Sequence, residues 1–161
     1  MPIQVGETLP NVNLYQMSTN GPNPISVESL FSGRKVVVFA LPGAFTPTCS
    51  AAHLPGFLVM ADQIKQLGID EIVCLSVNDA WVMDAWGKQQ NAENILMLAD
   101  GSADFTDAID LTVDLTEKGM GVRSRRYAMI VNDGVVEWLG LDEPGKFALS
   151  SAEAVVKQLA N

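Results

Sequence analysis

Two unbroken apolar runs lie in the first half of this chain, at residues 35–41 (KVVVFAL) and 71–77 (EIVCLSV). A run without polar alternation is typical of a strand that is buried on both faces of a sheet. Each run is followed by a segment with helical spacing of its apolar residues, at about 48–67 and about 80–90. Gly68 stands where a helix-ending glycine is expected. The pattern therefore predicts two central strands, each leading into a helix.

Shorter patterns predict the remaining elements. They are a short extended segment around 12–15, a helical turn at 26–31, a strand at 95–98, a short helix at 105–109, a hairpin of strands 126–131 and 135–139, and a last helix at about 151–159. Asn78 or Asp79 is expected to cap the second long helix. Ser150 with Glu153 is expected to form a capping box for the last helix. This order predicts one α/β domain over residues 1–161, with a mixed sheet and helices on both faces.

Composition and charge narrow the functional classes. The 161 residues include 19 Asp and Glu against 10 Lys and Arg, a net charge of −9, and phosphate binding needs a basic surface, so nucleic acid is not an expected partner. No membrane span and no secretory signal are expected, because no apolar stretch reaches ~18 residues and the N-terminus lacks a basic and an apolar region. Two cysteines and one histidine are too few for a four-ligand zinc site, so no metal or bound cofactor is expected. The low cysteine content predicts a reducing, cytoplasmic setting.

The segment 42–49 (PGAFTPTC) joins the first buried strand to the first long helix. Cys49 is therefore expected where the helix begins, facing free backbone N–H groups and the positive end of the helix dipole. Such a position favours the thiolate, which is the reactive form of cysteine. A small buried apolar residue is the plainer interpretation of a cysteine, and it fits this loop-to-helix position less well.

Position alone does not make such a thiol reactive. Lowering a free thiol's pKa from about 8.5 to about 6 takes about 3.4 kcal/mol, whereas a helix N-terminus contributes at most about 2 kcal/mol. A nearby cation or hydrogen bonds to sulfur must supply the rest. Within the cluster Arg123, Arg125 and Arg126, the expected cation is Arg126, because it opens the predicted hairpin. The Thr46 hydroxyl can donate to the sulfur or accept from a substrate, and Pro42 can shield the sulfur from water.

Other cysteine chemistries fit this sequence less well. A dithiol oxidoreductase needs C-x-x-C, and Thr46 occupies the first position of that motif. A cysteine hydrolase needs a histidine base. The only histidine, His53, lies four residues after Cys49, and we expect it to be a helix-surface or packing residue. Cys74 lies inside the second buried strand, where burial is expected to keep a thiol inert.

With these residues in view, the sequence resembles the peroxiredoxins. The pattern Pro42-x-x-x-Thr46-x-x-Cys49 with the later Arg126 is similar to the family's signature. The sequence around the cysteine and the following segment 53–57 (HLPGF) are similar to those of one subgroup, which holds the mammalian atypical five-type and the plant type II enzymes. Further matching segments are 74–79, 86–87 and 123–127. This resemblance implies a thioredoxin-like fold with an N-terminal extension.

The resemblance also implies a thiol-dependent peroxidase that acts in antioxidant defence. Cys49 would be the peroxidatic cysteine, which attacks hydrogen peroxide or an alkyl hydroperoxide and becomes a sulfenic acid. Thr46 would hydrogen-bond the sulfur and the peroxide, and Pro42 would shield the sulfenate. Arg126 would stabilise the thiolate and orient the peroxide.

How the sulfenic acid is reduced stays open. Cys74 stands at the spacing proposed for a resolving cysteine in plant type II relatives, whereas no cysteine lies near the C-terminus, where the mammalian five-type enzyme keeps its own. An inert Cys74 requires an outside thiol. Type II relatives lead us to expect glutathione with glutaredoxin, and thioredoxin is the alternative. The resemblance further implies a homodimer, with Phe45, Trp81 and Leu141 as candidate contacts.

Two further expectations concern the use of Cys49. The rival function is a peroxide-sensing redox switch or a chaperone-like binding protein, which the lack of an appended domain or basic segment disfavours. Pro55 removes one hydrogen bond from the first long helix and predicts a kink. We therefore expect the first turn, residues 48–52, to unwind and expose an oxidised Cys49.

Overall fold

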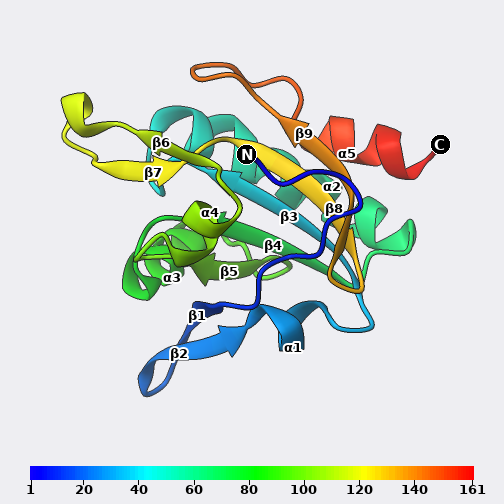
Figure 1. Cartoon of the computed structure of the whole chain (residues 1–161), viewed down its shortest axis with the longest axis horizontal. Helices are drawn as coiled ribbons and strands as arrows, with labels where there is room; N and C mark the ends of the chain where they lie inside the picture. The colour runs from blue at the N-terminus through cyan, green and yellow to red at the C-terminus, as the bar shows by residue number, and fades with distance from the viewer.

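A seven-stranded mixed sheet forms the centre of the computed structural model, which describes residues 1–161 (Figure 1). The strands lie in the order β2-β1-β5-β4-β3-β8-β9. Their bounds are β1 Asn13–Ser18, β2 Gly21–Ser26, β3 Lys35–Leu41, β4 Glu71–Ser76, β5 Leu96–Ala99, β8 Tyr127–Asn132 and β9 Val135–Leu141. A separate two-stranded ribbon of β6 (Thr112–Asp114) and β7 (Val122–Ser124) projects from one side of the molecule (Figure 1).

Helices cover both faces of the sheet. They are α1 Val27–Phe31, α2 Leu54–Gln66, α3 Ala80–Gln89, α4 Asp104–Ala108 and α5 Ala152–Leu159, with a 3-10 turn at Thr116–Lys118. On β3, Val37 and Phe39 belong to the buried cluster formed with α2, α3 and α5. Val36 and Val38 belong to the other cluster, formed with α1 and α4. The unbroken apolar run thus reflects a strand buried on both faces, as predicted.

The pairing of β3 brings two distant parts of the chain together. This strand is parallel to β4 on one side and antiparallel to β8 on the other. Near its end, Ala40 pairs with Tyr127, the first residue of β8. The loop that leads from β3 to Cys49 therefore starts beside Arg126, although 77 residues separate the two side chains.

The helix expected over 48–67 has an irregular beginning. Cys49–His53 forms a π-helical turn, in which the N–H of Leu54 reaches back to the carbonyl of Cys49. Pro55 follows this turn directly, inside a helical segment that runs without a break from residue 47 to residue 66, so its missing N–H leaves a gap in the hydrogen-bond ladder. The irregularity predicted for this proline takes the form of a π-helical turn directly before it.

The start of the last helix differs from its prediction. Ser151 caps α5, and its side chain accepts a hydrogen bond from the N–H of Ala154. The predicted capping box of Ser150 with Glu153 is therefore wrong. The Ser150 hydroxyl instead donates to Asp142 at 2.6 Å, because a carboxylate faces it across the preceding loop.

Of the two candidate caps predicted for α3, the structure has Asp79, which accepts from the N–H of Val82 at 2.9 Å. Differences from the prediction lie at the edges of the fold. The extended segment around 12–15 is a full strand that pairs with β2, and the β6–β7 ribbon was not predicted. None of the helices is both long and apolar enough to cross a membrane.

Candidate active site

Cys49 is the first residue of the π-helical turn after β3, and its side chain is fully buried. The loop before it is held locally, because the Thr46 hydroxyl donates to the carbonyl of Gly43 at 2.7 Å. The N–H of Ala44 donates to Oδ1 of Asn78 at 3.0 Å, which ties the loop to the segment after β4. The backbone that carries the sulfur is thus fixed from two directions.

Arg126 is the cation that contacts the sulfur. It directly precedes β8, and its Nη2 donates to Sγ of Cys49 at 3.2 Å. Its Nη1 lies 2.8 Å from Nδ1 of His53. A guanidinium in this position stabilises a thiolate through both charge and a hydrogen bond, which a helix N-terminus alone does not achieve. The predicted pair of Cys49 and Arg126 is therefore present in the structure.

His53 is a buried hydrogen-bond acceptor for Arg126. Its Nε2 lies 2.9 Å from the carbonyl oxygen of Ser150. A carbonyl can only accept, so Nε2 carries the proton and Nδ1 is free to accept from the guanidinium. Burial, together with the charge of Arg126, lowers the pKa of His53 to about 3, and the ring is neutral at physiological pH. The sequence predicted a helix-surface or packing residue; the ring does pack, between Phe39 and Phe147, but it also orients Arg126.

Asp142 holds the loop that presents the Ser150 carbonyl. Its Oδ1 accepts from the N–H groups of Ala148 and Leu149, at 3.0 and 2.8 Å. Its Oδ2 accepts from the N–H and the hydroxyl of Ser150, at 3.2 and 2.6 Å. Burial opposes ionisation here, but the four hydrogen bonds outweigh it and hold the pKa of Asp142 below its ordinary value. This role of Asp142 was not predicted, since only the serine at the helix start carries a recognisable sequence signal.

Pro42 and Thr46 lie in the loop beside this contact. A cavity of about 240 Å³ opens between Pro42 and Arg126, and the Pro42 carbonyl accepts from Nη1 of Arg123 at 3.2 Å. The Thr46 hydroxyl donates to Gly43 rather than to the sulfur, so its oxygen keeps lone pairs that can accept from a bound molecule. The structure thus brings Pro42 to the cavity and Cys49 to Arg126, and leaves Thr46 with a backbone partner.

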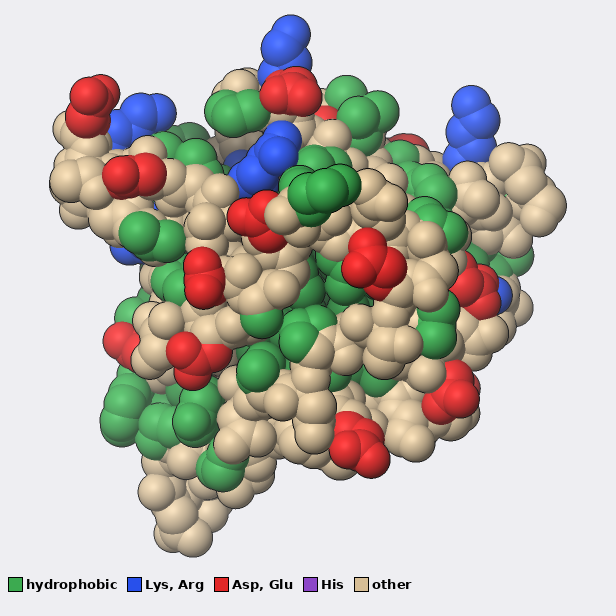
Figure 2. Space-filling view, in the orientation of Figure 1, with side chains coloured by type: hydrophobic (Ala, Val, Ile, Leu, Met, Phe, Trp, Pro, Cys, Tyr) green, Lys and Arg blue, Asp and Glu red, His purple; other side chains and the backbone are tan.

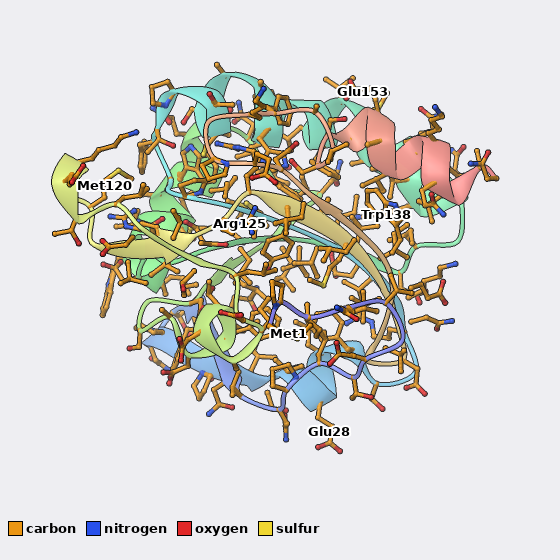
Figure 3. The ribbon with its side chains drawn as sticks, turned by 45° about the horizontal axis from the view of Figure 1, so that its top comes forward. Met1, Glu28, Met120, Arg125, Trp138 and Glu153 are labelled. Atoms are coloured by element: carbon orange, nitrogen blue, oxygen red, sulfur yellow. The ribbon has the colours of Figure 1, made fainter.

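The two neighbouring arginines have structural partners of their own. Arg123 donates through Nε to the carbonyl of Met120 at 3.0 Å, on the ribbon that projects from the sheet. Arg125 donates through Nη2 to the carbonyl of Asp142 at 3.2 Å. Figure 3 shows Met120 on the ribbon and Arg125 close to the middle of the molecule. Neither guanidinium hydrogen-bonds to the sulfur, in agreement with the choice of Arg126 as the expected cation.

Cys74 lies in the middle of β4, between β3 and β5, and is fully buried. Burial, reinforced by the charge of Cys49, raises the pKa of Cys74 well above its ordinary value. Both cysteines are free thiols. No group of three or more His, Cys, Asp or Glu side chains is arranged to hold a metal ion.

Comparisons with known proteins identify the family of the chain. The Redoxin family model matches residues 4–156. The chain is similar to Peroxiredoxin-2E, chloroplastic, of Arabidopsis thaliana, with 47% identity over 162 residues that cover 98% of this chain and 69% of that protein. It is similar to Peroxiredoxin-2B of the same plant, with 44% identity over 160 residues, or 98% of this chain and 99% of that protein.

Among solved structures, the chain is similar to reduced Prx3 in complex with hydrogen peroxide from Vibrio vulnificus. The TM-score is 0.95 at 54% identity, over 98% of this chain and 99% of that one. The mixed sheet with flanking helices is thus the thioredoxin-like fold that the sequence predicted. The chain therefore belongs to the redoxin family as a peroxiredoxin, a thiol-dependent peroxidase.

Proposed function

We propose that Cys49 is the peroxidatic residue of this peroxidase. The main support for this proposal is the position of the Arg126 guanidinium. It contacts the sulfur at 3.2 Å and is itself oriented by neutral His53. The thiolate attacks the terminal oxygen of a hydroperoxide, so that an S–O bond forms and the O–O bond breaks. The departing oxygen takes up a proton and leaves as water or an alcohol, and Cys49 becomes a sulfenic acid.

The other predicted residues have supporting roles in this proposal. Arg126 stabilises the negative charge that moves from sulfur to the departing oxygen, because its Nη2 already donates to the reacting sulfur. Thr46 accepts a hydrogen bond from the terminal hydroxyl of the hydroperoxide, using the lone pairs left free by its bond to Gly43. Pro42 limits the access of water to the sulfenate from the cavity side.

We propose that an outside thiol, and not Cys74, reduces the sulfenic acid. Cys74 is fully buried in a central strand with a raised pKa, so it forms little thiolate and has no path to the solvent. The first outside thiol condenses with the sulfenic acid to a mixed disulfide and water, and a second thiol releases Cys49. Glutathione with glutaredoxin is the favoured source, and a dithiol protein such as thioredoxin is the alternative.

Mass spectrometry after one equivalent of hydrogen peroxide tests the site and the reductant together. The expected products are a sulfenic acid on Cys49 without glutathione and a glutathione adduct on Cys49 with it. A disulfide between Cys49 and Cys74 would overturn the assignment of an outside thiol. Sustained turnover with thioredoxin and none with glutathione and glutaredoxin would overturn the favoured reductant.

We also propose a homodimer in a reducing, cytoplasmic setting. Phe45 in the active-site loop and Trp81 on α3 are large apolar side chains, and they are 49% and 63% exposed. Leu141, the third candidate contact, is half-buried at the end of β9. Sedimentation equilibrium of wild type and of Trp81→Asp tests this proposal, and a monomeric wild type would contradict it.

A further inference from the structure

Basic side chains gather around the cavity beside Arg126, although the chain as a whole is acidic. Of the 10 Lys and Arg residues in a protein with a net charge of −9, four line this cavity: Lys118, Arg125, Arg126 and Lys146. In the space-filling view, basic side chains lie mostly in the upper part of the face, whereas acidic ones are spread across it (Figure 2). The cavity mouth is therefore a local cationic region.

The cavity has an apolar part to its lining as well as its cations. Arg126, at the inner end, contacts the reactive sulfur, whereas Lys118 and Lys146 are exposed. Val113, Leu115 and Phe147 contribute apolar surface to the lining, and the volume is about 240 Å³. This arrangement fits a small molecule with a hydroperoxide at one end, a short carbon chain, and a negative group at the other.

Two carboxylates also line the cavity, but they do not neutralise it. Asp142 accepts four hydrogen bonds from its own loop. Glu143 is 78% exposed, and its carboxylate lies 4.0 Å from Nη2 of Arg125, so water weakens this pair. The buried Nε of Arg125 has no hydrogen-bond partner. Positive charge and hydrogen-bond donors in the cavity lining therefore remain available to bind a ligand.

We propose that this cavity is a carboxylate-binding subsite, which makes carboxylate-bearing organic hydroperoxides better substrates than neutral ones of the same size. The inference rests on the proposed role of Cys49 and names the substrate class of that site. Lys118 and Lys146 at the rim bind the carboxylate while the apolar part of the lining holds the chain. The hydroperoxide end then lies beside Arg126 and Cys49. A carboxylate is also present on a thiol such as glutathione, and the experiment separates the two sources.

The first arm compares a short hydroperoxyalkanoic acid with its methyl ester, which differ by one charge. Stopped-flow fluorescence gives the rate constant of Cys49 oxidation for each, with hydrogen peroxide as reference. The acid is expected to react about fivefold faster than the ester, the size of one or two exposed ion pairs. In the double variant Lys118→Ala/Lys146→Ala, or in about 0.5 M salt, this ratio falls to about one. The matched control is Lys88→Ala/Lys157→Ala, which removes the same charge from α3 and α5 and keeps the ratio.

The second arm reduces the preformed sulfenic acid with glutathione or with its diethyl ester. Equal rates for these two thiols, with a charge preference in the first arm, support the substrate assignment. A preference confined to glutathione would overturn it and assign the subsite to the reductant. Equal rates for acid and ester in wild type, or a preference that survives in Lys118→Ala/Lys146→Ala, would also overturn it. If the proposed peroxidatic role of Cys49 were wrong, the result would be different, because hydrogen peroxide would then not oxidise Cys49 either.

Discussion

Cys49 and Cys74 are both fully buried, yet the groups around their sulfur atoms differ. The sulfur of Cys49 accepts a hydrogen bond from Arg126 in a loop-to-helix junction. Cys74 lies in a central strand, where burial raises its pKa and no side chain donates to it. Burial therefore does not decide whether a cysteine reacts. The difference that the structure shows is a charged donor at the sulfur of Cys49 and an irregular helix start around it.

The two cysteines also differ in the hydrogen bonds that hold Arg126 in place, and not only in the contact between Arg126 and Cys49. The carboxylate of Asp142 fixes Ser150, whose carbonyl fixes the proton on His53. His53 then accepts from Arg126, which donates to Cys49. A network in which every donor has an acceptor holds its members in one geometry. The surroundings of the Cys49 sulfur thus include residues as far away as the loop after β9, whereas those of Cys74 are the packed neighbours of a central strand.

Among changes that test the comparison of the two cysteines, loss of the Cys49 thiol is expected to have the largest effect. Cys49→Ser is expected to abolish peroxide reduction, because a hydroxyl at neutral pH is a far weaker nucleophile than a thiolate. Coupled consumption of hydrogen peroxide measures this loss, and circular dichroism checks that the variant folds. Retained turnover in Cys49→Ser would mean that Cys74 carries the chemistry.

The next effect concerns the charged donor. Arg126→Met is expected to lower the rate constant of Cys49 oxidation by about 10²–10³, the cost of removing one preorganised donor from a reacting centre. Arg126→Lys recovers only part of it, because one ammonium does not reproduce the planar fork that spans the sulfur and His53. Stopped-flow oxidation at matched pH measures both variants. An Arg126→Met variant as fast as wild type would remove the main distinction between the two cysteines.

A third effect, on stability, follows from the neutral ring of His53. An unfolded histidine has a pKa of about 6.5, and the folded value of about 3 means that the unfolded chain binds the additional proton between these values. The free energy of unfolding therefore falls as pH drops from about 6.5 toward 3, by at most about 1.4 kcal/mol per pH unit. Urea denaturation between pH 4.5 and 6.5 measures this slope.

His53→Gln is the matched control, because its amide has both a donor and an acceptor but does not titrate in this range. The variant is expected to flatten the slope. The lowered pKa of Asp142 adds a further loss, but only below about pH 4, outside that window. An unchanged slope in His53→Gln would show that other groups control the acid sensitivity.

The sequence predicted the central strands and the pair of Cys49 and Arg126 because these depend on local signals. Apolar runs locate β3 and β4, and the energetic shortfall of a helix N-terminus required a cation. The support from Asp142 was not predictable, since it depends on how the loop after β9 folds back on α2. The wide turn was predicted only as a kink, because Pro55 marks a break in the helix without specifying its geometry.

A smaller effect concerns the backbone that carries each cysteine. Residues 49–53 form a π-helical turn at a helix start, whereas β4 is paired with β3 on one side and β5 on the other. Amide hydrogen exchange is therefore expected to be faster at 49–53 than in β4, and faster still after oxidation of Cys49, which places oxygen in a filled site. Equal protection of the two segments in both redox states would refute opening of this turn.

The smallest effect is expected at the second cysteine. Cys74→Ala should leave glutathione- and glutaredoxin-linked turnover within about twofold of wild type, because its buried thiol takes no part in the proposed cycle. Cys74→Ser, a matched variant, buries a hydroxyl among apolar neighbours and is expected to lower the free energy of unfolding by about 1–3 kcal/mol. Urea denaturation and steady-state turnover separate these two readouts. A loss of turnover in the stably folded Cys74→Ala would show that Cys74 reaches the oxidised sulfur, and that the contrast between the two thiols holds only in the reduced state.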